Sequence, residues 1–468
     1  MFQFIYCLKN KLKSGFIFIC LVACASSLPA QIKSIMLTQP GALLKENKTT
    51  VLPANSKIFS VDLNALQSIK KSFSGAASLQ KQRVHVSIPL PEGGSFTVKL
   101  EPSATMEPLL AEKFAQIKTF RCYGITNKAV YGSLMINQYG VDVFLSGPSF
   151  ELNILPNGFD DKTSHRIFWG KDAPFKNSVV CENTDTPLFK IHPNTGYSFA
   201  KISAGNYIKN YRIAIVNTAT PADFSCYRSV TPYNFDNPSN FITAVTAHLA
   251  KVNVNYERDM GIHFMLVNNN EQLFLADEIN SSLGSGRYPF TSSLGGSSIY
   301  NIHKFITDVI GTANFDIGHC LEGSCNGAGV AFVSGVCNSA NKGKGKSAYP
   351  SVNTFCHEIG HQFSAPHSWN AVSCGSQWSS LSAVEPGAGI TWMSYKNRCA
   401  LSDQVAHQEN DNNAIQFAHV KSYEFIQNFS NSLLGNCALI YPVNNNAPVV
   451  TVPDGGFYIP MLTPFQLT

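Results

Sequence analysis

The residues best suited to chemistry lie in one stretch, 357–367, which reads His-Glu-Ile-Gly-His-Gln-Phe-Ser-Ala-Pro-His. His357 and His361 are four residues apart, so on a helix they project from one face, where two imidazoles can bind one metal ion. His367 follows a proline, at a point where the helix must already have ended. Three neutral nitrogen ligands leave a tetrahedral zinc ion one open position for water, and Glu358 beside them can take that water's proton. The pattern predicts metal-assisted hydrolysis.

A helix must position the first two histidines, and the apolar residues around them have helical spacing. Phe355, Ile359 and Phe363 recur every four residues on the side opposite the histidines. We therefore expect one face of this helix to be buried and the other to be presented to a cleft.

A second motif follows in residues 385–395, Glu-Pro-Gly-Ala-Gly-Ile-Thr-Trp-Met-Ser-Tyr, a turn whose methionine could lie under the metal. A long histidine motif followed by such a Met-turn resembles the metzincin clan of zinc endopeptidases. Residues 315–319, 327–333 and Cys337 are similar to the reprolysin (adamalysin-like) branch, and more narrowly to the reprolysin-like peptidases secreted by bacteria. The resemblance covers roughly residues 85–468, with its sharp motifs in 311–395.

This resemblance implies roles for the motif residues. His357, His361 and His367 would bind one catalytic Zn²⁺. Glu358 would be the general base and later return the proton to the leaving amine, and Met393 would form the apolar floor beneath the metal. Protein or peptide substrates are implied.

Two further sets of residues gain expected roles from the same resemblance. Val330, Ala331 and Phe332 match the strand on the upper rim of the cleft, where an extended substrate pairs by main-chain hydrogen bonds. Tyr395 stands where some metzincins place a tyrosine that binds zinc or stabilises the oxyanion. A packed core tyrosine is the equal alternative.

One residue departs from the family pattern: Ser364 stands where a glycine is usual, three residues after the second histidine. Glycine there lets the backbone leave the helix sharply with positive φ, so that the third histidine returns to the metal. Serine can adopt that conformation at about 1 kcal/mol or slightly more, which weakens the site without abolishing it.

The implied function is a secreted zinc-dependent metalloendopeptidase, and two other classes remain open. A catalytically impaired, protease-like surface adhesion or binding module is one, with Ser364 as its first sign of decay. The other is a zinc peptidase whose third ligand is a glutamate on a later helix, which His367 and the Met-turn disfavour.

Glu385 is expected to be a solvated loop carboxylate. Ordering the Met-turn or binding Ca²⁺ are its alternatives, and nothing else in the sequence supports calcium.

Composition narrows the class of protein further. The 468 residues, 44% hydrophobic, suffice for two or three domains. Three lysines, then an apolar run at 15–25 and small residues ending at Ala30, read as an export signal, too short to remain as a transmembrane segment. Without those lysines the net charge falls from +5 to +2 (32 basic, 30 acidic), which does not suggest nucleic acid as a partner. Cleavage before Cys24, as in a bacterial lipoprotein, is the minority alternative. We expect a monomer.

The pattern of elements predicts an α/β (α+β) fold with a sheet flanked by helices, preceded by a β-rich unit. The resemblance implies that the first is a metzincin-like catalytic domain, with a mixed twisted sheet, flanking helices and an active-site helix, and that the β-rich unit is its pro-domain. Strands are expected at 84–90, 96–100 and 141–145, an irregular region at 150–207, helices after Asn237 and at 299–310, and a last helix at 412–429. The expected domains are a signal peptide (1–30), the pro-domain (31–205), the catalytic domain (206–440), and a linker with the start of a truncated β-sandwich (441–468).

The 13 cysteines suggest an oxidising compartment. Three lie in the export signal, Cys122 and Cys181 in the segment after it, and eight from Cys226 onward. Spacing alone does not fix the pairings. By similarity to reprolysins, the expected pairs are Cys337 with Cys437 and Cys374 with Cys399.

Alternatives remain open for the other cysteines. Cys320 and Cys325 are close enough for a local loop, and a second zinc site formed with Cys337 is the disfavoured alternative. Cys122 or Cys181 could hold the enzyme latent by binding zinc's open position, or the two could pair with each other. His248, His303, His319, His407 and His419 lack ligand spacing and are expected to be packing or surface residues.

Overall fold

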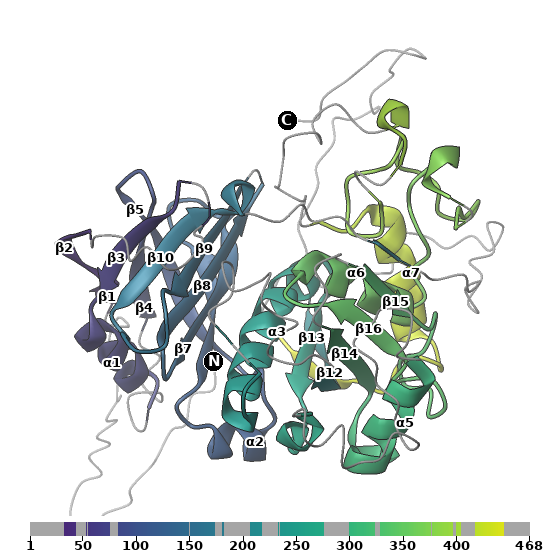
Figure 1. Cartoon of the computed structure of the whole chain (residues 1–468), viewed down its shortest axis with the longest axis horizontal. Coiled ribbons are helices and arrows are strands. Elements are labelled where there is room, and N and C mark those ends of the chain that lie inside the picture. Colours follow the sequence, from purple (N-terminus) through teal and green to yellow (C-terminus); the bar gives the residue numbers. More distant parts are fainter. Residues whose placement is uncertain are drawn as a thin grey trace, which may run out of the picture.

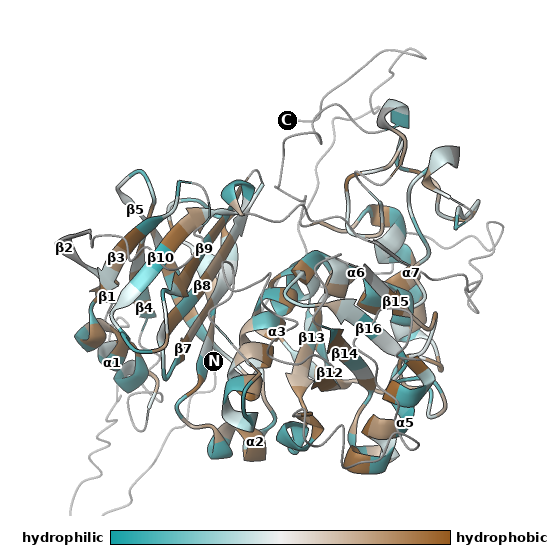
Figure 2. Cartoon of the chain, viewed as in Figure 1, coloured by the Kyte–Doolittle hydropathy of each residue, from teal (hydrophilic) through white to brown (hydrophobic). Residues whose placement is uncertain are grey.

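The structure is a computed structural model. It describes residues 32–43, 53, 55–74, 83–148, 150–173, 180–181, 206–217, 233, 235–275, 299–322, 328–375, 377–395, 399–403 and 417–443. Two β-sheets stand side by side, with the long helix α3 (Pro238–Met260) between them (Figure 1). Hydrophobic residues run along the strands of both sheets (Figure 2).

The first sheet is formed by residues 32–169 and has ten strands in the described part of the chain. Neighbouring strands are antiparallel except the parallel pair β1 and β4. We call this sheet, with the helices between its strands, the N-terminal unit. In spatial order its strands are β1 (Ile32–Met36), β4 (Arg83–Pro89), β5 (Ser95–Ser103), β6 (Lys118–Gly124), β7 (Tyr131–Asn137), β8 (Gly140–Gly147), β9 (Phe150–Pro156), β10 (Ser164–Trp169), β3 (Lys57–Val61) and β2 (Thr38–Leu43).

The second sheet carries the histidine motif and mixes parallel with antiparallel pairs. We call it, with its helices, the catalytic unit. In spatial order its strands are β11 (Val180–Cys181), β15 (Ala328–Ala331), β16 (Gly345–Ala348), β14 (Ile317–Glu322), β12 (Tyr207–Asn217) and β13 (Ile262–Leu266), with β17 (Leu439–Pro442) also paired to β12.

Helices flank both sheets. α3 begins at an N-cap, Asn237, whose side chain accepts from the Asn240 amide, and it ends at Gly261 with φ +61°. In both places the sequence signals match the local geometry. The other α-helices of the described residues are α1 (Leu63–Ser72), α2 (Pro108–Lys113), α5 (Ile299–Ile310), α6 (Val352–Gln362) and α7 (Val420–Asn431).

Alternation along the N-terminal strands separates an apolar face from a polar one. On β8, Val141 and Val143 are buried in the core of the N-terminal unit, whereas Asp142 faces α3 and forms an ion pair with Lys251 at 3.4 Å. The catalytic core instead gathers around α3 and α6, and it includes side chains of the α2 region such as Leu110 and Phe114. The two units therefore share polar contacts and an apolar cluster.

The expected α/β fold with a β-rich N-terminal region is confirmed. The expectation of an irregular region at 150–207 is wrong in its first part, which forms β9 and β10. Polar residues such as Glu151 and Asn153 alternate with the apolar ones there because they face the catalytic unit, and this hid the strand pattern. β17 extends the catalytic sheet through Pro442, past the expected end at 440.

Two disulfides are seen among the described residues, and both were expected. Cys337 is bonded to Cys437, and Cys374 to Cys399. Because the Cys337 sulfur is in a disulfide, the three-cysteine zinc site is excluded. The Cys325 partner of the expected local loop lies outside the described residues, as do the export signal, Cys24, the 444–468 tail and His407. Among the described residues, no helix is long and apolar enough to span a bilayer.

Candidate metal centre

Helix α6 presents the first two histidines as the spacing predicted. The Ser351 hydroxyl caps its N-terminus by accepting from the Thr354 amide at 3.2 Å. Phe355, Ile359 and Phe363 are fully buried in the catalytic core. The expectation that the opposite face would be presented to a cleft is wrong for this form of the chain, since the histidine face is buried as well.

The three histidines of the motif converge on one point. The Nε2 atom of His361 lies 3.1 Å from that of His357 and 3.2 Å from that of His367. A tetrahedral zinc ion with bonds of about 2.0–2.1 Å holds two nitrogens about 3.3 Å apart. In the described part of the chain, these three form the one His/Cys/Asp/Glu group with metal-site geometry. The donor set and its spacing therefore fit zinc.

Backbone carbonyls fix the tautomer of each ring. The Nδ1 atom of His357 donates to the Trp392 carbonyl at 2.6 Å, and that of His361 to the Ala365 carbonyl at 2.7 Å. His367 Nδ1 donates to the carbonyl of residue 377 at 3.1 Å. With the proton on Nδ1, each ring directs the lone pair of its Nε2 toward the shared point. These carbonyls could not be located from the sequence.

Burial also keeps the rings neutral. It lowers the pKa of His357 to about 4, and it lowers the pKa of His361 and His367 well below the usual value, with the neighbouring imidazoles adding to the effect. Neutral imidazole is the form that binds a metal. The site is thus prepared for a cation at neutral pH.

The turn after α6 has the strain that the sequence predicted. Ser364 has φ +76° and is fully buried. Its amide donates to the His361 carbonyl at 2.8 Å, and the next amide donates to the Gly360 carbonyl at 2.9 Å, so the turn closes on the helix. His367 nevertheless reaches the other two rings. Serine at this position strains the site without opening it.

Met393 lies directly beneath α6, at Gly360. A Cβ built on Gly360 would be 2.5 Å from the Met393 sulfur, so any side chain there would displace the methionine. Met393 is fully buried. Gly360 is a residue the sequence reasoning missed, although it stands inside the motif.

Glu358 is fully buried beside the rim strand β15. A Cβ on Gly329 would lie 2.5 Å from the Glu358 Cγ and 2.6 Å from its Oε1. The backbone of β15 therefore passes directly against the carboxylate, and only glycine fits there. Gly329 is the second missed residue. In the sequence, the Gly-Ala-Gly motif at 327–329 indicates only a similarity to reprolysins and does not indicate a contact with Glu358.

The expected rim residues surround that contact. Val330 and Ala331 are in β15, antiparallel to β16, with Val330 half-buried and Ala331 buried. Phe332 follows the strand, and its amide donates to the Lys344 carbonyl at 2.8 Å. The other edge of β15 carries β11, in parallel register, with Cys181 opposite Gly329. A strand from the segment that precedes β12 in the chain thus occupies the edge expected to pair with substrate.

Tyr395 stands beside the histidines. Its ring centroid is 4.7 Å from that of His367 and 6.1 Å from that of His357, and its hydroxyl donates to the Gln377 side chain. Gln377 also supplies the carbonyl that orients His367. The structure places Tyr395 at the metal centre, and a role in binding or catalysis stays a prediction.

Cys122 is not near the histidines. It is buried in the core of the N-terminal unit, burial raises the pKa of its thiol, and it forms no disulfide among the described residues. This makes it unsuited to be a latency thiolate. The backbone of Cys181 pairs with the rim strand β15. Its side chain lies outside what the structure describes, so a latency role for Cys181 stays a prediction.

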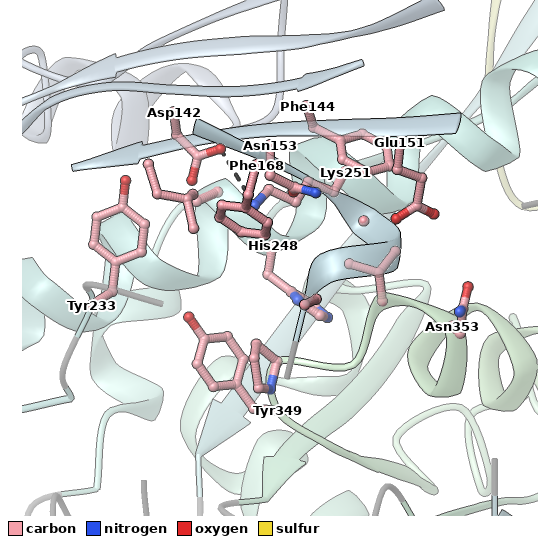
Figure 3. A pocket seen from close by; sticks show the side chains of 16 residues that line it. Asp142, Phe144, Glu151, Asn153, Phe168, Tyr233, His248, Lys251, Tyr349 and Asn353 are labelled. Atoms are coloured by element: carbon pink, nitrogen blue, oxygen red, sulfur yellow. Dashed lines mark ion pairs between the residues drawn. The ribbon is translucent and has the colours of Figure 1, made fainter. Parts of the chain in front are cut away.

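A cavity of about 110 Å³ lies away from the histidines, between the N-terminal sheet and the helices α3 and α6. Figure 3 shows Asp142 and Lys251, which come from the two units, joined by an ion pair in its lining. Its walls mix acidic, basic and aromatic groups and belong to the seam between the units. His248, expected to be a packing residue, lies in this wall and is buried.

Comparison with known proteins agrees with this geometry. Residues 242–368 match the family described as metallo-peptidase family M12B, reprolysin-like. The chain carries a reprolysin-like metallopeptidase segment. The match runs from the start of α3 to the residue after the third histidine, so it includes His357, Glu358 and His361 together with His367 but stops before the Met-turn.

Other comparisons are more distant. Among solved structures, the chain is similar to metalloproteinase-II from Bacteroides fragilis, at 10% sequence identity and a TM-score of 0.36. That match covers 72% of this chain and 90% of that one. No curated protein sequence matches the chain. At the level of the family, the reprolysin-like segment implies a zinc-dependent peptide hydrolase that acts on protein substrates.

Proposed function

We propose that this protein is a secreted zinc metalloendopeptidase with one catalytic Zn²⁺ bound by His357, His361 and His367. The observation that carries the proposal is the convergence of three imidazoles, each oriented by a carbonyl at its Nδ1. The Nε2 atom of His361 lies 3.1 Å from that of His357 and 3.2 Å from that of His367, and the three ligand atoms all lie within 4.8 Å of one another. Zinc bound there would supply a Lewis acid and lower the pKa of a water.

The chain's own residues would do the remaining work. Glu358, held against the glycine of β15, accepts a proton from the attacking water and returns it to the leaving amine. Once β11 has left it, the outer edge of β15 aligns an extended peptide by main-chain hydrogen bonds, so that the peptide carbonyl lies over the histidines. Tyr395 stands where it could donate to the developing oxyanion.

In this proposal the full chain is a latent form of the enzyme. β11 pairs with the β15 edge that a substrate would need, and the histidine face of α6 is buried. The position of Cys181 opposite Gly329 places it at the level of Glu358 along the rim. We therefore assign to the segment that precedes β12, which includes β11, the role of an inhibitory pro-segment, whose removal would free the edge.

Buried ionic contacts hold the N-terminal unit in place. The Glu257 carboxylate on α3 accepts from Arg121 at 2.5 and 2.9 Å, and from the Tyr131 hydroxyl at 2.6 Å. His263 faces Glu257 through Nδ1 at 2.5 Å and the Ala104 carbonyl through Nε2 at 2.9 Å. Two of these partners, Arg121 and Tyr131, come from the N-terminal unit, so its departure would leave Glu257 with fewer donors.

The alternative of an impaired binding module is not favoured by the site. Its main support was Ser364, and the turn at Ser364 still brings His367 to the metal centre. Secretion remains part of the proposal: the expected export signal supports it, and the two disulfides are consistent with an extracellular location.

The test is cleavage of casein or a quenched-peptide library after the segment before residue 206 has been nicked. We expect activity that is lost with a zinc chelator, regained with Zn²⁺ and insensitive to serine-protease inhibitors. Glu358→Ala should keep stoichiometric zinc and the fold while losing kcat by several orders of magnitude. Undiminished turnover by Glu358→Ala would refute the base assignment, and wild-type protein that binds zinc without cleaving any peptide would refute the proposed function.

A further inference from the structure

Glu385, expected to be a solvated loop residue, is buried at 4% exposure and has a full set of donors. Its Oε1 accepts from the Ser368 hydroxyl at 2.5 Å and from the Thr391 hydroxyl. Its Oε2 accepts from the amides of Ile390 at 2.7 Å and Thr391 at 3.0 Å. A charged carboxylate that takes four hydrogen bonds joins its partners strongly.

These donors come from two segments that meet at the metal centre. Ser368 directly follows the third histidine, and its amide donates to the Met393 carbonyl at 3.0 Å. In return, the amides of residues 384 and 385 donate to the Ser368 carbonyl at 3.0 and 2.9 Å. Ile390 and Thr391 belong to the Met-turn, whose residue 392 carbonyl orients His357. Glu385 therefore connects the third ligand to the turn that orients the first.

The backbone of the turn is shaped for this carboxylate. Gly389 has φ +69°, and a Cβ there would be 2.9 Å from the Glu385 Oε2 and 2.6 Å from the Ser394 Cβ. Only a glycine allows the two amides that follow to point at one oxygen. The hydrogen-bond donors and the glycine backbone of the turn therefore both fit a carboxylate at this position.

We propose that Glu385 is a positioning residue of the metal centre, which holds the His367 segment and the Met-turn at the spacing that zinc requires. The inference rests on the proposed function, in that it assumes zinc at the three histidines. Neither the histidine motif nor the family match, which ends at residue 368, assigns this residue.

Glu385→Gln tests the proposal because it keeps the shape of the side chain. An amide NH₂ group would face two of the four donors, leaving them without an acceptor and the two segments free to shift. We expect zinc affinity, measured in the full chain by competition with a chromogenic chelator, to fall about 10–100-fold. The visible spectrum of the Co²⁺-substituted protein should change, since it reports ligand geometry. Thr391→Val, which removes one donor only, should give a smaller loss in the same direction.

Glu257→Gln is the matched control, as it removes another buried, multiply hydrogen-bonded carboxylate on α3 rather than in the Met-turn. It should lower the melting temperature of the zinc-free chain at least as much as Glu385→Gln does, and leave zinc affinity and the Co²⁺ spectrum unchanged. Wild-type affinity and spectrum in Glu385→Gln, or equal losses in the control, would overturn the positioning role. A wild-type chain that binds zinc yet cleaves no peptide would instead count against the proposed function alone.

Discussion

Replacing Ser364 by glycine should stabilise the protein, because two unfavourable features meet at this one residue. Its φ of +76° is a conformation that a side chain disfavours. Its hydroxyl is fully buried and finds no hydrogen-bond partner among the described residues. Both features follow from the need to return the chain to His367 directly after α6.

The magnitudes can be estimated separately. Left-handed backbone costs about 1–2 kcal/mol for a residue with a Cβ. A buried hydroxyl without a partner costs about 1–3 kcal/mol. Glycine offsets about 0.5–1 kcal/mol of this gain because its unfolded chain is more flexible. We expect a net gain near 2 kcal/mol for Ser364→Gly, or a rise in melting temperature of roughly 4–8 °C for a unit of this size.

Ser364→Ala separates the two contributions, since alanine loses the hydroxyl and keeps the strained φ. Thermal and urea unfolding of the zinc-free wild type, Ser364→Ala and Ser364→Gly should therefore rank them in that order of increasing stability. Zinc affinity should be equal or tighter in Ser364→Gly, because the third ligand is then held without strain. The reasoning is refuted if Ser364→Gly is no more stable than Ser364→Ala, since φ would then carry no penalty.

Three further changes have definite expected outcomes. Gly329→Ala places a Cβ 2.5 Å from the Glu358 Cγ and should lower kcat at least 100-fold with zinc content unchanged, measured by peptide turnover and metal analysis; near-normal kcat would show that β15 can move. Burial by itself would raise the pKa of Glu257, but His263 and Arg121 outweigh it and lower the pKa to about 2, below the ordinary unfolded value of about 4.5. Its contribution to stability is therefore complete above pH 4.5 and lost as the pH falls toward 2, and urea unfolding between pH 5 and 2.5 should be less pH-dependent in Glu257→Gln than in wild type. Removing the Cys337–Cys437 disulfide, which spans 100 residues, by serine at both positions should destabilise the chain by about 4–5 kcal/mol in calorimetry, and an unchanged melting temperature would contradict this.

Much of the architecture could be predicted from local patterns. The helical period from Phe241 to Tyr256 and the Asn237 cap matched α3, and alternation in 84–90 and 141–145 matched β4 and β8. These patterns succeed where one face of an element is buried. β9 was missed because its polar residues are buried against the catalytic unit rather than solvated.

At the metal centre, the sequence supplied the ligands but little of what surrounds them. Helical spacing brought His357 and His361 together, and the third histidine past Pro366 completed the ligand set before the family resemblance was considered. Gly329 and Gly360 matter because their backbone lies against the side chains of Glu358 and Met393, and the sequence does not show these contacts. The positions of the carbonyls that accept from each Nδ1 are likewise set by the tertiary fold. The expectation that Glu385 is solvated was wrong for the same reason. A glutamate beside proline and glycine is typical of an exposed loop, and the tertiary fold supplies the donors that bury it.

The apolar cluster shared by the two units has a consequence for how the protein can be made. Leu110, Phe114 and Ile117, which precede the metal-binding region by more than two hundred positions, are nearly or completely hidden against α3 and its surroundings. A shortened chain that starts at residue 206 would lack these three side chains. It would have to repack around the cavity they leave, or else expose apolar surface of α3 to water. The N-terminal unit thus completes the apolar core of the unit that carries the histidines.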